Sequence, residues 1–212
     1  MKVKVFIWER RLSIASFGHA SMLVDSTYIS WWPGEAKKIE RSKINKIGLC
    51  KLKSDKEMPF YCPKNLQEDI EMMGSKPDHE FNITGLNSKE ILHMWDDILG
   101  KNKSITSRWK PVSKFIIKTF FPRQEKEMSK EYFEALWKGK KPKYNLAFMN
   151  CTHIVYLCLK SGGFGEILKK RRGKFDKFIF NSIDTISDIY ASFGNQYTKI
   201  EPRMLLSFLN LV

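Results

Sequence analysis

The chain has few cysteines and no long apolar run. Its four cysteines, at positions 50, 62, 151 and 158, form neither a pair of CxxC motifs nor a dense framework, which argues against a zinc site and a disulfide-stapled fold. No stretch approaches a membrane span, and the first ten residues lack the apolar run of a signal peptide. We therefore expect no metal, no leader of its own, and a cytoplasmic protein as made.

Acidic residues are also scarce, with 23 Asp and Glu against 37 Lys and Arg, which gives a net charge of +14. The basic residues cluster most densely at Lys169, Lys170, Arg171 and Arg172, a surface suited to an anionic membrane or an acidic protein. Nucleic acid is a weaker expectation. The six tryptophans and fifteen phenylalanines fall in apolar periodic runs, without the basic and aromatic interleaving of a base-stacking surface.

No linker or repeat divides the chain, so 212 residues with 42% hydrophobic content predict one domain with a substantial core. The pattern predicts an α+β fold. Expected strands and helices follow from alternation, 3.6-residue periodicity and capping residues. The strands are 2–8, 16–24, 28–32, 44–52, 114–120 and 144–148, and the helices are 65–73, 88–99, 130–138, 151–161, 185–193 and 202–211.

Cys151 opens an apolar helix that follows the turn at Met149 and Asn150 and ends at Gly162. A helix N-terminus stabilises a thiolate, because its unpaired N–H groups and dipole favour negative charge. The period predicts that one face anchors this helix, with the sulfur at the rim and Cys158 in the core. A small buried hydrophobic residue is the alternative reading of Cys151.

His19 begins a short β-type run that turns at Asp25 to Thr27 and returns through residues 28–32. The sequence therefore predicts a hairpin with a histidine on its first strand. Cysteine and histidine together suggest a nucleophile and its base. We place His79 in a polar loop and His93 on a helix, and we treat His153 as structural because it points about 200° from Cys151 around the helix axis.

The early histidine strand and the late Asn150-Cys151-Thr152-His153 segment resemble circularly permuted papain-like enzymes. That group includes the lecithin:retinol acyltransferase relatives and the Rho-inactivation domain of multifunctional autoprocessing toxins. The resemblance covers about 30 residues. It implies an antiparallel sheet packed on the cysteine helix, with a mostly helical insertion or cap at residues 53–143.

The resemblance leaves the residue that orients the histidine unassigned. In the acyltransferase relatives a second histidine on the following strand has this role, and the nearest positions here are Ser30 and Trp31. Ser30 is our third site residue, although strand alternation places it on the face opposite His19. Asp25 and Asp69 are the other candidates.

The sequence thus predicts a cysteine-dependent acyl-transfer enzyme. Cys151 is the nucleophile and His19 the general base, while Asn150 and Thr152 help to form or position the oxyanion site. The toxin resemblance implies a bacterial effector that transfers a fatty acyl group, with acyl-CoA as co-substrate, to lysines of a host GTPase. A peptidase or amidase of the same fold, and a non-catalytic basic binding module, remain alternatives.

Overall fold

The computed structural model of the chain describes residues 2–9, 18–34, 59–101, 143–144, 150–167, 205–206 and 209. Several predictions fall outside these residues. They are the strands at 44–52 and 114–120, the helices at 130–138 and 185–193, most of 144–148 and 202–211, and the basic cluster Lys169, Lys170, Arg171 and Arg172.

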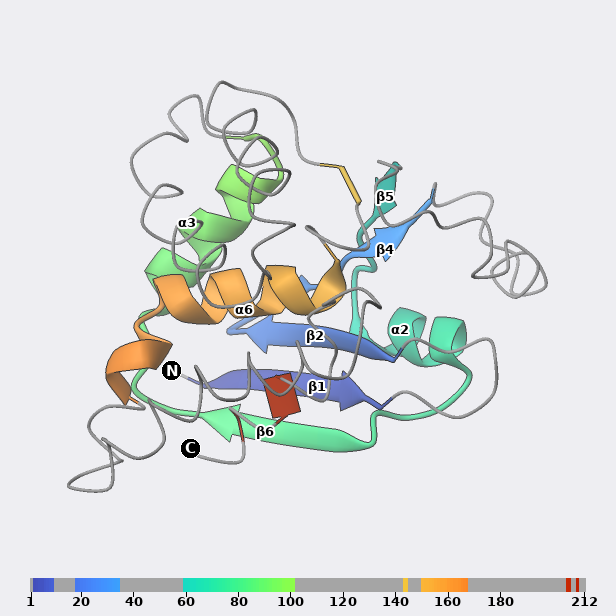
Figure 1. The fold of residues 1–212 in the computed structure, drawn as a ribbon, viewed down its shortest axis with the longest axis horizontal. Coiled ribbons are helices and arrows are strands. Elements are labelled where there is room, and N and C mark those ends of the chain that lie inside the picture. Colours follow the sequence, from blue (N-terminus) through green and yellow to red (C-terminus); the bar gives the residue numbers. More distant parts are fainter. Residues whose placement is uncertain are drawn as a thin grey trace, which may run out of the picture.

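Four antiparallel strands form the central sheet (Figure 1). They are β1 (Val3–Trp8), β2 (His19–Val24), β3 (Thr27–Ile29) and β6 (His79–Ile83), in the spatial order β3-β2-β1-β6. Their apolar and β-branched residues suit a pleated, buried surface. Helices combine with this antiparallel sheet, so the α+β expectation is confirmed.

The predicted hairpin is formed by β2 and β3, with Asp25 in its turn at a positive φ of 53°. Aspartate tolerates this left-handed conformation better than most residues. The second strand is shorter than the sequence predicted. It ends at Ile29, and Trp32–Pro33 forms a separate strand, β4, which pairs with β5 (Phe60–Tyr61) in a two-stranded sheet.

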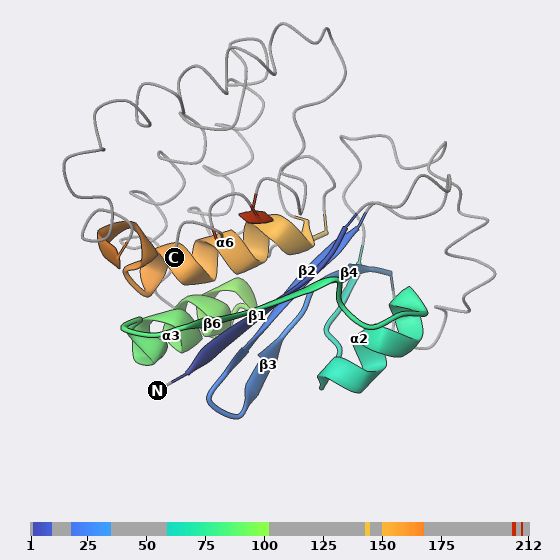
Figure 2. The same cartoon turned by 90° about the horizontal axis from the view of Figure 1, so that it is seen from below.

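The central sheet lies between helices on its two faces (Figure 2). One face packs on α3 (Ser88–Ile98) and α6 (Cys151–Ser161) through a large apolar core. The other face carries Phe6, Trp8 and Tyr28 against α2 (Leu66–Met73). Because side chains alternate along a strand, neighbouring residues of β2 serve different cores.

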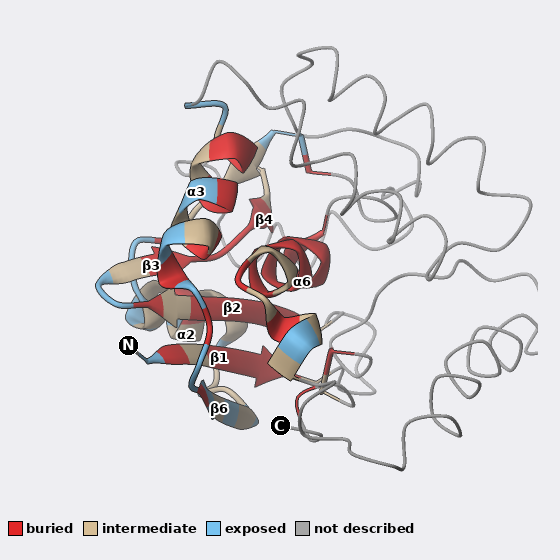
Figure 3. Cartoon of the chain, turned by 90° about the vertical axis from the view of Figure 1, so that its left-hand side faces the viewer, coloured by how far each residue is buried: buried red, intermediate tan, exposed pale blue. Residues whose placement is uncertain are grey.

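Helix α6 begins and ends where the sequence predicted, but its surroundings differ from the prediction. All residues from Cys151 to Leu159 are buried (Figure 3). We expected one anchored face with the sulfur at the rim. Over these residues, which are mostly apolar, the helix is instead buried on all sides. Cys158 is fully buried, so its predicted place in the core is confirmed.

Helices α3 and α6 approach closely at Gly162. A Cβ built there would lie 2.6 Å from Cγ1 of Ile91, so only glycine fits without movement. Helix α3 is capped by Asn87, whose side chain accepts a hydrogen bond from the Glu90 N–H at 3.3 Å.

Strand β6 corrects our placement of His79 in a loop. Residues 79–83 pair with β1, with Val3 opposite Ile83 and Ile7 opposite His79. This strand lies within 53–143, the range we expected to form an insertion, and so do α2 and α3. Among the described residues, none of the helices is both long enough and apolar enough to cross a membrane.

Candidate active site

Cys151 is placed by the capped start of α6. The Asn150 side chain accepts a hydrogen bond from the His153 N–H at 3.0 Å, which fixes the first turn. The charge of His19 and the backbone N–H of Ala20 both act on the Cys151 thiol and lower its pKa, and the sulfur lies 3.9 Å from the Thr152 hydroxyl. The N-terminus of α6 therefore meets the first residues of β2.

His19 is the first residue of β2 and is almost fully buried. Its Nε2 atom lies 3.1 Å from Oδ2 of Asp69 and 3.1 Å from Oγ of Ser30. Because Nε2 is engaged by these two oxygens, Nδ1 is the ring nitrogen that remains for the Cys151 sulfur. The imidazole thus interacts with both a carboxylate and a thiol whose residues are 82 positions apart in the chain (69 and 151).

Asp69 projects from α2 and has no solvent exposure. Its Oδ2 accepts hydrogen bonds from the Tyr28 hydroxyl at 2.5 Å and from His19, while Oδ1 accepts from the Ser30 hydroxyl at 3.0 Å and from Nε1 of Trp32 at 2.7 Å. Four donors therefore surround one buried carboxylate. A buried charge needs this degree of satisfaction to remain ionised.

The electrostatics of the three groups favour their charged forms. Burial lowers the pKa of His19, but the charges of Asp69 and Cys151 outweigh burial and raise it to about 10. Burial raises the pKa of the Cys151 thiol, but His19 outweighs burial and brings it below its ordinary value. The pKa of Asp69 is likewise lowered, because burial is outweighed by His19 and the surrounding donors. These directions favour a thiolate, an imidazolium and a carboxylate at the site.

Ser30 contacts His19, which corrects our placement of the two residues on opposite faces. The register pairs Met22 with Ile29 and Leu23 with Tyr28, so continuing it sets Ser30 opposite Ser21, on the His19 face. Ser30 donates to Asp69, so its oxygen is left to accept from His19. Ser30 therefore helps Asp69 to orient His19 and does not replace Asp69 in that role.

The other predicted site residues fall into two groups. Asn150 and Thr152 are buried in the first turn of α6, where Asn150 caps the helix and Thr152 approaches the sulfur. Asp25 is exposed in the hairpin turn. Within the described residues, no group of three or more His, Cys, Asp and Glu side chains could hold a metal ion.

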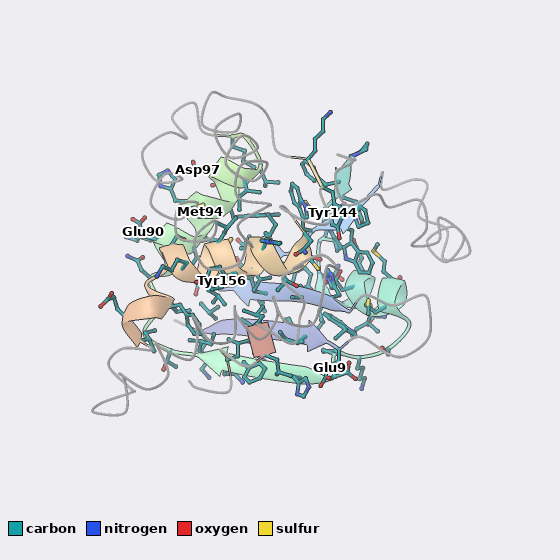
Figure 4. All side chains as sticks on the ribbon, in the orientation of Figure 1. Glu9, Glu90, Met94, Asp97, Tyr144 and Tyr156 are labelled. Atoms are coloured by element: carbon teal, nitrogen blue, oxygen red, sulfur yellow. The ribbon has the colours of Figure 1, made fainter. Side chains whose placement is uncertain are left out.

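Four aromatic residues at the site were not predicted. Trp8 and Trp32 flank the His19 ring, and Tyr28 donates to Asp69. Tyr144 is buried and lies beside the N-terminal end of α6 (Figure 4). Burial and the Cys151 charge raise the pKa of Tyr144 well above its ordinary value, so its hydroxyl keeps its proton near the thiolate. Only the exact hairpin register, which the structure supplies, would have identified Trp32 and Tyr28.

The remaining cysteines and His153 differ from the site residues. Burial raises the pKa of Cys62 to about 12, although Lys101 opposes the shift, and burial raises the pKa of Cys158 further. His153 is fully buried, and burial lowers its pKa to about 3, so its ring is neutral. Among the cysteines that the structure describes, Cys151 alone has a lowered pKa.

Comparison of this chain with protein-family models, curated proteins and solved structures gives no match.

Proposed function

We propose that this protein is a cysteine-dependent acyl-transfer enzyme, with Cys151 as nucleophile, His19 as acid and base, and Asp69 as the residue that orients His19. One observation carries the proposal. The buried His19 ring hydrogen-bonds the Asp69 carboxylate and interacts electrostatically with the Cys151 thiol. A structural cysteine has no need of an imidazolium partner, whereas a thiol nucleophile does.

The chemistry follows from the charges. The Cys151 thiolate attacks a carbonyl carbon, and backbone N–H groups at the start of α6 stabilise the oxyanion. The tetrahedral intermediate collapses, and the leaving group takes the proton that His19 holds. Water or an amine then attacks the S-acyl carbon and gives a proton to the neutral imidazole. Departure of the thiolate restores the resting ion pair.

Asp69 gives His19 a fixed orientation and a compensating charge. The hydrogen bond from Nε2 keeps the ring from turning, and the carboxylate stabilises the imidazolium that forms in each cycle. Ser30, Tyr28 and Trp32 in turn hold the carboxylate. Asp69 belongs to α2, which lies between the histidine strand and the cysteine helix in the chain sequence. In the acyltransferase relatives a second histidine has this orienting role instead.

The order of the site residues supports a permuted papain-like core as the fold. The histidine strand precedes the cysteine helix in the chain, and the two elements pack together. On this proposal the substrate is a thioester, ester or amide. The toxin resemblance makes a long-chain acyl-CoA the first donor to test, with a lysine side chain as acceptor.

The test is covalent labelling with a thiol-directed acyl or vinyl probe at neutral pH, read by intact mass and peptide mapping. We expect one equivalent on Cys151 in the wild type, no equivalent in Cys151→Ala and much slower labelling in His19→Ala. The matched control is Cys158→Ala, which should label like the wild type. Equal labelling of the wild type and Cys151→Ala would refute the proposal and favour a non-catalytic module.

A second assay identifies the acceptor. The protein is incubated with palmitoyl-CoA and a lysine-rich protein, and the products are analysed by mass. An acylated lysine indicates a transferase, whereas CoA release with free palmitate indicates a hydrolase. Cleavage of peptide substrates without either product would identify the amidase alternative. In every case the activity should disappear in Cys151→Ala.

A further inference from the structure

A row of three aromatic rings crosses the sheet at His19. Trp8 is the register partner of His19 on β1. On the other side, the β2–β3 register that pairs Met22 with Ile29 sets Trp32 opposite His19 when it is continued three residues. Two tryptophans therefore reach the imidazole, Trp8 from the neighbouring strand β1 and Trp32 from β4, the short strand that follows β3 in the chain.

The distances place both indoles in contact with the ring. The Trp32 centroid lies 4.4 Å from that of His19 with an interplanar angle of 33°, and the Trp8 centroid lies at 5.4 Å with an angle of 45°. A cation within about 6 Å of an indole face is stabilised, most strongly where water is excluded. Both tryptophans are buried.

Each indole is held by its own hydrogen bond, and the two bonds differ. Nε1 of Trp8 donates to the backbone carbonyl of Ser75 at 2.8 Å, which anchors the ring to the chain after α2. Nε1 of Trp32 donates to Oδ1 of Asp69 at 2.7 Å. Trp32 therefore touches both charges of the ion pair, with its face toward the imidazole and its N–H toward the carboxylate.

We propose that Trp32 is a positioning residue that keeps His19 in its charged form, with Trp8 as a weaker second support on the neighbouring strand. The electron-rich indole faces favour the imidazolium over the neutral ring. The Trp32 N–H favours the ionised carboxylate that the imidazolium needs. This inference rests on the proposed role of the Cys151 and His19 pair, and it names the residues that keep that pair charged.

A purely structural role for the tryptophans gives a different expectation. Trp8 belongs to the small core beneath α2, so its loss would reduce stability whatever the charge of His19. A structural role leaves the titration of Cys151 unchanged in any variant that still folds. If the tryptophans keep His19 charged, replacing them raises the pH at which Cys151 loses its proton.

The test is the rate of Cys151 alkylation by iodoacetamide between pH 5 and pH 10 in the full chain, followed by peptide mapping. The variants are Trp32→Phe, Trp8→Phe and, as the control, Trp31→Phe. Trp31 lies next in the chain but in the opposite core, stacked on Phe60 at 3.8 Å. Circular dichroism and the urea midpoint of each variant establish that it is folded.

In Trp32→Phe we expect the apparent pKa of Cys151 to rise by about one unit, so that alkylation below that pKa slows about tenfold. Trp8→Phe should give a smaller rise, and Trp31→Phe none. If Trp32→Phe does not fold, the wild-type chain with fluorinated tryptophan replaces it. Fluorination weakens the negative indole face but keeps the N–H, and it should also raise the apparent pKa.

The two possible failures give different results. A wild-type Cys151 that titrates like an ordinary thiol would overturn the proposed ion pair itself. The other failure is a wild-type Cys151 whose pKa is lowered but does not change in Trp32→Phe, or in the fluorinated chain where that is used instead. This result would leave the Cys151 and His19 ion pair in place and overturn the role of Trp32.

Discussion

Replacing Asp69 by asparagine removes one charge from the buried centre of the site and changes little in shape. The carboxylate accepts four hydrogen bonds, two at each oxygen. An asparagine side chain offers one oxygen and one NH₂ group, and NH₂ cannot accept. Whichever way the amide turns, two donors lose their acceptor. The His19 imidazolium also loses its compensating charge.

The cost follows from burial. Removing one partner of a buried charge pair costs about 3–5 kcal/mol, because the remaining charge stays desolvated. We expect Asp69→Asn to lower the free energy of unfolding at pH 7 by about that amount. The imidazole can relieve part of the cost by losing its proton. In that case its pKa falls, the pKa of Cys151 rises, and alkylation of Cys151 at pH 7 slows.

The assay is urea unfolding followed by circular dichroism, with Asp96→Asn as the matched control. Asp96 is half-exposed and pairs with Lys101 at 2.8 Å, so its loss should cost less than about 1 kcal/mol. The difference between the wild type and Asp69→Asn should also depend on pH. Because the folded-state pKa of Asp69 lies below its ordinary value, its contribution is present above about pH 4 and is lost as the pH falls. Equal costs for the two variants at pH 7 would refute the four-donor description of Asp69.

Two further predictions concern the placement of α6. Gly162→Ala should destabilise the protein by about 1–3 kcal/mol in thermal or urea unfolding, because the new Cβ meets Ile91 at 2.6 Å. The control Gly165→Ala should cost far less, because its Cβ meets only the flexible end of Lys160. Equal costs for the two variants would contradict the close packing at Gly162. Asn150→Ala should cost about 1 kcal/mol through the lost cap and also slow Cys151 alkylation. Asn87→Ala, the corresponding cap of α3, should cost a similar amount without changing the alkylation rate, and a change in both variants would show that the effect is not local to α6.

Local signals in the sequence were sufficient to predict the helix that carries Cys151 and the hairpin that carries His19. Helix α6 was predicted from the turn at Met149 and Asn150 that precedes it and from its stop at Gly162, and the hairpin from the turn at Asp25 to Thr27. These features depend on residues close together in the chain, where turn and cap preferences act. Strand β6 also had a local signal. Phe81 and Ile83 alternate with exposed neighbours, a period of two that we took for a loop.

The sequence offered Ser30, Asp25 and Asp69 as residues that could orient His19, but local signals could not choose among them. Asp69 lies 50 residues after the histidine, and only tertiary packing of α2 beneath the sheet brings it to the ring. Trp32 needed the exact strand register, because a shift of one residue would move it to the other face. The pair β4 and β5 is too short to leave a periodic pattern.

The difference in absorbance at 240 nm between the wild type and Cys151→Ala, followed from pH 5 to pH 10, tests the central claim most directly, because a thiolate absorbs there and a thiol does not. The lowered pKa of Cys151 and the raised pKa of His19, about 10, predict that the thiolate signal is already present at pH 7. It should shift to higher pH in His19→Ala. A signal that appears only between pH 8 and pH 9, and in the same way with or without His19, would contradict the account.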